Sequence, residues 1–168
     1  MTYADCGLAV SRSYFVELVA PTIRQHLPEL RYAAARMGAG SEVLGLDDEM
    51  SRDHDWGLRL QLFVPHADVT HLLSMLDKRL PNQFRGHPVR FGFSGDPAVR
   101  LRIDVQTVDS LLATRLGFDP RRAPSAMDWL SLTGQAVLEI TAGEVFRDDL
   151  GDLTSLREAL SWYPEEVW

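Results

Sequence analysis

The chain has 168 residues and a formal net charge of −7, because 24 acidic side chains outnumber 17 basic ones. This surplus of negative charge disfavours proteins that coat nucleic acids or anionic membranes, so we expect no membrane partner and no large nucleic-acid partner. The length and the 45% hydrophobic content suit a single domain over residues 1–168, with a further helical region beyond it if the chain is a fragment. The single cysteine, Cys6, cannot form an internal disulfide, and the absence of a signal-peptide pattern favours a cytoplasmic location.

The predicted elements are helices with an apolar stripe and strands in which every second residue is apolar. The first helix contains Pro21, which should kink or split it. Residues 30–37 fit either a helix or a short buried strand, and residues 38–41 form a glycine-rich turn. In chain order we expect a helix over 13–27, a strand over 53–64, a helix over 67–80, strands over 89–93 and 99–106, and helices over 107–116, 125–141 and 153–161.

The predicted strands show which residues should be buried. In the strand over 53–64, Leu58, Leu60 and Leu62 fall on one face. The strand over 99–106 has the cleanest alternation, and its two faces consist of Val99, Leu101, Ile103 and Val105 inward and of Arg100, Arg102, Asp104 and Gln106 outward. Strands that come early and helices that come late predict an α/β (α+β) fold, with a small mixed β-sheet covered by helices.

Two short motifs stand out because of their order and spacing. Gly40 and Ser41 lie in the turn, and Asp53-His54-Asp55 follows after eleven intervening residues. Residues i and i+2 of a strand project from one face, so Asp53 and Asp55 should point the same way and require a cation. Hard oxygen ligands favour Mg²⁺ or Mn²⁺ over Zn²⁺. A glycine-serine turn brings N–H groups and a hydroxyl to a phosphate, so the pair of motifs predicts metal-assisted phosphoryl or nucleotidyl transfer.

This arrangement resembles the signature of the polymerase-beta-type nucleotidyltransferase superfamily. In that superfamily a Gly-Ser turn precedes an Asp-x-Asp strand, and a third carboxylate comes from a later strand. Gly40 and Ser41 match the turn, Asp53 and Asp55 match the metal-binding pair, and Asp104 is the natural third acid. The further matches are Gly45 and Ser51, and the departures from the pattern are Arg52 and His54.

Residues 40–57 also resemble the hallmark of a bacterial branch of this superfamily that is known mainly as a domain of unknown function. The resemblance spans roughly residues 14–168, and members of the branch continue into a further helical region. The later segments that are similar to the branch are 128–130, 143–151 and 162–164.

The resemblance implies transfer of a nucleoside monophosphate from an NTP to an acceptor hydroxyl, with release of pyrophosphate. Asp53 and Asp55 would hold two Mg²⁺ ions, with Mn²⁺ as a substitute, and Asp104 would complete the ligand set and accept the hydroxyl proton. We expect a small molecule as the acceptor. The residues that would contact the triphosphate or offset its charge are Gly40, Ser41, Arg52 and Arg102.

Two alternatives stay open at this point. Asp104 shares its strand face with Arg100 and Arg102, so an ordinary surface ion pair competes with the role of third metal ligand. A catalytically inactive nucleotide-binding or protein-interaction module of the same fold, including one half of a toxin–antitoxin pair, competes with the enzyme.

Overall fold

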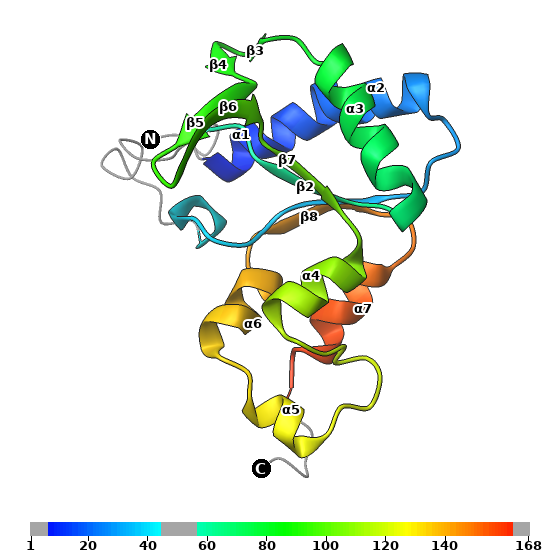
Figure 1. Ribbon diagram of the computed structural model, residues 1–168, viewed down its shortest axis with the longest axis vertical. Helices are drawn as coiled ribbons and strands as arrows, with labels where there is room; N and C mark the ends of the chain where they lie inside the picture. Colours follow the sequence, from blue (N-terminus) through cyan, green and yellow to red (C-terminus); the bar gives the residue numbers. More distant parts are fainter. Residues whose placement is uncertain (1–6, 45–56, 163–168) are drawn as a thin grey trace.

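The computed structural model describes residues 7–44 and 57–162, and its centre is a four-stranded sheet in the order β7-β2-β1-β8 (Figure 1). β1 pairs antiparallel with β2 and with β8, whereas β2 and β7 run parallel. The predicted α/β class with a small mixed sheet is therefore confirmed. The four strands are β1 (Ala33–Arg36), β2 (Leu60–Phe63), β7 (Ile103–Gln106) and β8 (Glu144–Asp148).

Helices cover both faces of the sheet, and each face has its own apolar core. On one face, the first helices and α3 pack on side chains that include Ala34, Leu60 and Leu62. On the other, the later helices pack on Ala33 and Ala35, the neighbours of Ala34 in the same strand. The helices are α1 (Gly7–Tyr14), α2 (Ala20–His26), α3 (Val69–Arg79), α4 (Val108–Arg115), α5 (Ala126–Leu130), α6 (Gly134–Thr141) and α7 (Asp152–Ala159).

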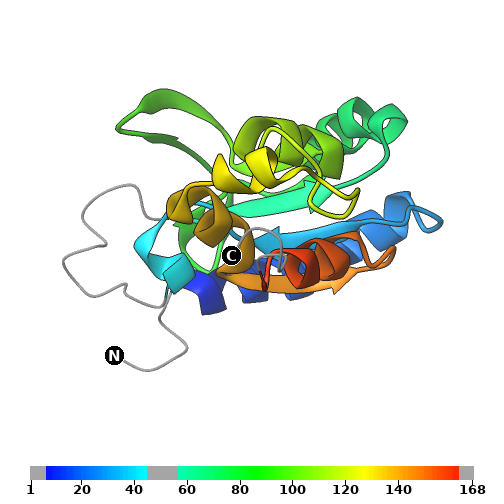
Figure 2. The same ribbon diagram turned by 90° about the horizontal axis from the view of Figure 1, so that it is seen from below.

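Several short elements complete the described chain. Figure 2 shows that the hairpin of β5 and β6 lies on the same side of the molecule as α3 and α4. None of the helices in the described ranges combines the length and the apolar character needed to cross a bilayer. The short elements are the π-helical turn η2 (Phe15–Val19), the 3₁₀ turns η3 (Ser41–Leu44) and η5 (His66–Asp68), and the strands β3 (Gln83–Phe84), β4 (His87–Pro88), β5 (Arg90–Phe93) and β6 (Asp96–Leu101).

The predicted interruption of the first helix at Pro21 is confirmed. The chain forms α1, then the π-helical turn η2, and then α2, in which Pro21 occupies the first turn. Proline has no N–H to donate to the preceding turn, and a wider turn accommodates the missing hydrogen bond. The ambiguous segment over 30–37 contains the strand β1, whose four residues are all buried.

The single strand predicted over 99–106 is wrong, because the chain breaks at Arg102. Before this residue, β6 pairs with β5 in a hairpin, and after it β7 pairs with β2. Val99, expected inward, is 74% exposed on the hairpin, and Arg102, expected outward, is only 8% exposed. The alternation of apolar and polar residues over 99–106 does not show that its two halves belong to two different sheets.

The second half of the chain differs from the predicted elements at one helix and adds a strand that was not predicted. The helix predicted over 125–141 is two helices, α5 and α6, because Thr133 caps a new helix by accepting a hydrogen bond from the N–H of Ala136. The segment 143–151 contains the edge strand β8, whose residues are half-buried in a pattern without a clean alternation. Burial against β1, rather than its own sequence pattern, makes this segment a strand.

Candidate functional site

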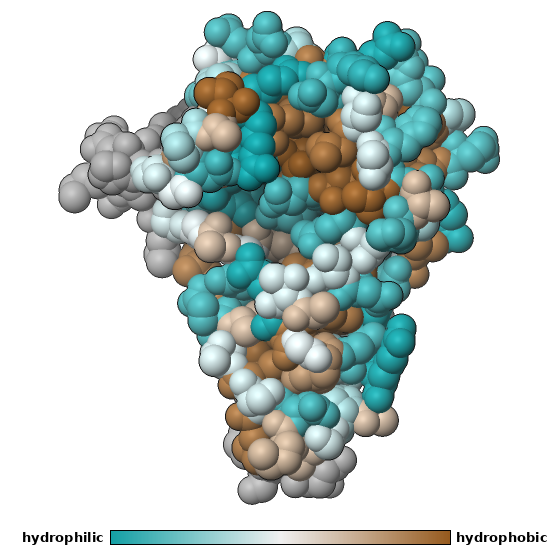
Figure 3. All heavy atoms as spheres, in the orientation of Figure 1, coloured by the Kyte–Doolittle hydropathy of each residue, from teal (hydrophilic) through white to brown (hydrophobic). Residues whose placement is uncertain are grey.

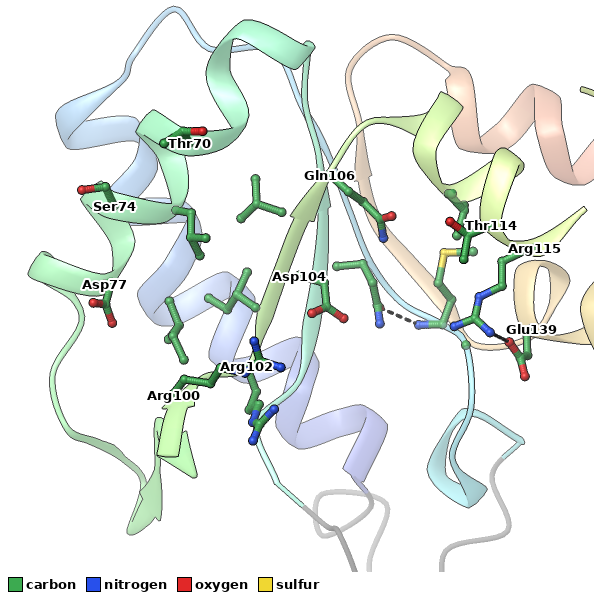
Figure 4. Close-up of a pocket in the computed structure, with 18 residues that line it drawn as sticks. Thr70, Ser74, Asp77, Arg100, Arg102, Asp104, Gln106, Thr114, Arg115 and Glu139 are labelled. Atoms are coloured by element: carbon green, nitrogen blue, oxygen red, sulfur yellow. Dashed lines mark hydrogen bonds and ion pairs between the residues drawn. The ribbon is translucent and has the colours of Figure 1, made fainter. Parts of the chain in front are cut away.

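A cavity of about 740 Å³ lies along the edge strand β7, between α3 and α4 (Figure 4). Its apolar lining includes Leu73, Leu101 and Ile103, and Figure 3 shows apolar surface in this region beside α3. Hydroxyl groups of Thr70 and Ser74 on α3 also line it. An apolar cavity with a few polar groups is typical of small-molecule sites.

Asp104 is the acidic side chain at the centre of this cavity. It is exposed on β7, directly opposite Gln61 of β2, and Figure 4 shows its carboxylate in the space between α3 and α4. Asp104 has no hydrogen bond or ion pair to any described residue, whereas Arg102 pairs with Asp96. The surface ion pair that sequence analysis left open is therefore not formed between Asp104 and Arg100 or Arg102.

A second cavity of about 190 Å³ adjoins the first, and Asp104 and Gln61 line both. Its other lining is strongly basic and includes the backbone of the segment that leads to the Gly40–Ser41 turn. We call this cavity the arginine recess. Its basic side chains are Arg36, Arg59, Arg102 and Arg115.

The Glu42 carboxylate binds the guanidinium groups of two arginines that line the recess. Its Oε1 accepts hydrogen bonds from Nη2 of both Arg36 and Arg59. Arg36 and Glu42 are almost fully buried, at 1% and 6% exposure, whereas the Arg59 side chain is 21% exposed. Arg36 also donates to the backbone oxygens of Met37 and, at 2.9 Å, Ala39, so it ties the end of β1 to the turn that follows.

Two carboxylates, those of Glu42 and Asp104, act on the charge of Arg36. Burial and the neighbouring charge of Arg59 lower the pKa of Arg36, against the attraction of both carboxylates. Burial by itself raises the pKa of the Glu42 carboxyl, but the two guanidinium groups outweigh this effect and hold that pKa below its ordinary value. Glu42 is therefore ionised at neutral pH and is shared by two guanidinium groups.

The Gly40–Ser41 turn lies directly against this group. Gly40 has φ +137°, and a Cβ there would overlap Oε2 of Glu42 and lie 2.8 Å from Nη2 of both Arg36 and Arg59. Only glycine allows the backbone to approach the two guanidinium groups this closely. Ser41 then opens the 3₁₀ turn η3, so the predicted turn is confirmed.

Arg102 has a structural role at the junction of β6 and β7. It donates from Nε to the Phe91 oxygen at 2.7 Å and from Nη1 to Asp96 at 2.8 Å, and Nη2 bonds the oxygens of Asp96 and Ala98. Its guanidinium also lies 4.4 Å from the ring centroid of Phe93. Four of its donated hydrogen bonds hold the hairpin, so little of its donor capacity faces the cavity.

The structure thus places Asp104 in both cavities, and it places Gly40 against Arg36 and Arg59, which line the arginine recess. Asp53, Asp55 and Arg52 lie outside the described residues, and within the described ranges no group of three His, Cys, Asp or Glu side chains forms a metal cluster. The described chain resumes at Gly57, where a Cβ would overlap the ring of Phe91.

Sequence analysis missed Arg36, Glu42 and Arg59. Only the antiparallel pairing of β1 with β2 brings Arg36 and Arg59 side by side, although they are 23 positions apart. Glu42 belongs to an acidic stretch that looks like a solvated loop. The available signal was its position directly after the Gly-Ser turn.

The late part of the chain forms the core below the sheet, with Trp129, Ile140 and Leu153 among its buried side chains. Residues 129–168 match the model of a domain of unknown function (DUF4037). The match covers 40 of the 168 residues and includes the late segments 143–151 and 162–164 and all of 128–130 except Asp128, which resemble a domain-of-unknown-function branch. Comparisons with curated proteins and with solved structures give no match. The resemblance of residues 40–57 and the link to the nucleotidyltransferase superfamily remain predictions.

Proposed function

We propose that the chain is a metal-dependent nucleotidyltransferase of the polymerase-beta-type superfamily. It would transfer a nucleoside monophosphate from an NTP to a hydroxyl of a small acceptor and release pyrophosphate. The observation that supports this proposal most is that Gly40 lies directly against Arg36 and Arg59, which line the same recess as the Asp104 carboxylate near one edge of a mixed sheet. Gly40 and Asp104 belong to two of the three elements that the superfamily signature requires.

The residues that would hold the metal are Asp53, Asp55 and Asp104, with Mg²⁺ as the expected ion and Mn²⁺ as a substitute. Asp104 fits this role because its exposed carboxylate has no ion pair to a described residue and is free to act as an oxygen ligand. Bound ions of this kind polarise phosphoryl oxygens and activate an attacking hydroxyl.

The position of the Asp-x-Asp pair in the sequence supports its proximity to the arginine recess. Asp55 precedes Arg59 by four residues, and Arg59 directly precedes β2. Asp104 would also take the proton of the acceptor hydroxyl.

The larger cavity supports a small acceptor. Its volume of about 740 Å³ falls within the range of about 300–1,000 Å³ that is typical of small-molecule sites. The chain's net charge of −7 further disfavours a nucleic-acid acceptor. An acceptor in this cavity would lie on Leu73 and Ile103 with a hydroxyl directed at Asp104.

The test is release of pyrophosphate from NTPs in the presence of Mg²⁺ and a panel of small hydroxyl compounds. Asp53→Asn should abolish release while circular dichroism shows an unchanged fold, and Asp104→Asn should reduce it strongly. Asp109→Asn is the matched control, because Asp109 is an exposed acid on α4 that does not line either cavity at this edge. Full activity of Asp53→Asn would contradict the proposed metal site. NTP binding without any release would favour the inactive nucleotide-binding module.

A further inference from the structure

The guanidinium of Arg59 differs from the other three in the arginine recess in how its donors are used. Arg102 donates four hydrogen bonds to the hairpin and shares Asp96 with Arg100, and Arg115 pairs with Glu139. Arg36 is nearly inaccessible and donates to two backbone oxygens in addition to Glu42. Arg59, in contrast, is partly exposed and donates one hydrogen bond to a described residue, to the Glu42 carboxylate that it shares with Arg36.

Most of the hydrogen-bonding capacity of Arg59 is unused within the described chain. Of the five N–H donors of a guanidinium, one bonds Glu42, and the buried Nε has no partner among the described residues. The guanidinium lies 5.3 Å from the ring centroid of Phe93, which supports it from the side of the hairpin. The remaining donors on Nη1 and Nη2 are therefore the ones available to an anion in the recess.

The position of Arg59 places this unused capacity beside the Gly40–Ser41 turn. Its Nη2 lies 2.8 Å from the point where a Cβ on Gly40 would be, so a phosphate held by the turn would lie within reach of the guanidinium. The 21% exposure of the Arg59 side chain makes it accessible from the recess. A planar guanidinium suits the bidentate recognition of phosphate oxygens.

We propose that Arg59 is a phosphate-binding residue, and that the Arg36–Glu42 pair orients its guanidinium toward an anion held at the Gly40–Ser41 turn. This inference rests on the proposed function for the identity of the ligand as an NTP. The guanidinium of Arg59 then neutralises part of the triphosphate charge. Arg102 stays with the hairpin and does not supply this charge.

The experiment measures two probes by calorimetry in the presence of Mg²⁺, ATP and inorganic tripolyphosphate. Arg59→Ala should weaken the binding of both probes about 10- to 100-fold, as expected for loss of charge-assisted hydrogen bonds. Arg59→Lys keeps the charge and the contact with Glu42 but loses the fork, so it should weaken binding by a smaller factor. If Arg59→Ala does not fold, the affinities of Arg59→Lys for the two probes test whether Arg59 binds phosphate.

The matched control is Arg121→Ala. Arg121 has the same degree of side-chain exposure, 20%, and is ion-paired with Asp119 and Asp152 away from the recess, so its removal should leave both affinities unchanged. Wild-type affinity of Arg59→Ala for ATP would overturn the inference and leave the proposed function intact. Tripolyphosphate binding that requires Arg59, in a chain that does not bind ATP, would retain the anion site and overturn the proposed function. A wild-type chain that binds neither probe would overturn both.

Discussion

Replacing Glu42 with glutamine should destabilise the fold more than any other single loss of charge in the described chain. The side chain is 6% exposed and is the shared partner of two guanidinium groups, one of which, on Arg36, is itself buried. Glutamine keeps the shape of the side chain but leaves two adjacent positive charges without a counterion.

The size of the effect follows from competing terms. Each contact between opposite charges at about 4 Å is worth about 4 kcal/mol at an effective dielectric constant of 20, and desolvation of the carboxylate offsets part of this. Because Arg36 then stays buried and unpaired, we expect a net loss of about 3–5 kcal/mol in the free energy of unfolding. Urea unfolding followed by circular dichroism measures it.

The matched control is Glu17→Gln. Glu17 pairs with Arg85 at 2.6 Å, but both side chains are about half exposed, so the loss should stay below about 1 kcal/mol. The double variant Arg36→Met/Glu42→Met should be more stable than Glu42→Gln. It removes the buried Arg36 guanidinium together with the Glu42 carboxylate, so no unpaired charge stays buried at this position. A cost for Glu42→Gln below about 1 kcal/mol would refute the assignment of Glu42 as the counterion of both arginines.

The remaining predictions concern stability and pH. Leu62→Ala, at a fully buried position of β2, should cost about 2–5 kcal/mol in urea unfolding, whereas Leu73→Ala, at a position 39% exposed, should cost clearly less; equal costs would contradict the assigned core. Gly143→Ala and Gly117→Ala both meet a positive φ, but only at Gly143 would the new Cβ overlap the backbone oxygen of a neighbouring strand. We therefore expect a loss of about 1 kcal/mol at Gly117 and a larger loss at Gly143 in thermal unfolding, and the reverse order would contradict the described turn. Burial raises the pKa of Tyr14 well above its ordinary value of 10, so its contribution is intact below pH 10 and is lost as the pH rises beyond it. Tyr14→Phe should therefore flatten the alkaline limb of the stability curve, and an unchanged limb would contradict this cause.

The pH dependence of Glu42 has the opposite sign to that of Tyr14. Its folded-state pKa lies below the ordinary value of 4.5, so the unfolded chain binds a proton first as the pH falls. The stabilisation by Glu42 is therefore present above about pH 4.5 and is lost below it. Acid unfolding of Glu42→Gln should start from a lower stability and fall less steeply, and an unchanged slope would count against this cause.

The sequence predicted the parts of the fold that depend on local periodicity. Leu58, Leu60 and Leu62 share one buried core, as their alternation indicated, and Pro21 interrupts the first helix as its missing N–H requires. The sequence did not predict the break at Arg102, because the residue has a strand-like neighbourhood on both sides and its hydrogen bonds form only once the hairpin has folded back.

The candidate site divides in the same way. The turn at Gly40 and Ser41 was predictable, since glycine and serine in that order mark it. The grouping of Arg36, Glu42 and Arg59 was not, because it depends on which strands pair and in which register. Asp104 was predicted as an acid on the outer face of its strand, and the structure adds that no described cation pairs with it.

The central claim is that the chain binds an NTP with Mg²⁺ through the Asp-x-Asp pair at this edge of the sheet. The most direct measurement is calorimetric titration of ATP and other NTPs with and without Mg²⁺, on the wild-type chain and on the Asp53→Asn/Asp55→Asn variant. We predict binding that requires Mg²⁺ and that the double variant loses while its unfolding transition is retained. Equal binding by both chains, or no binding by the folded wild type, would contradict the account.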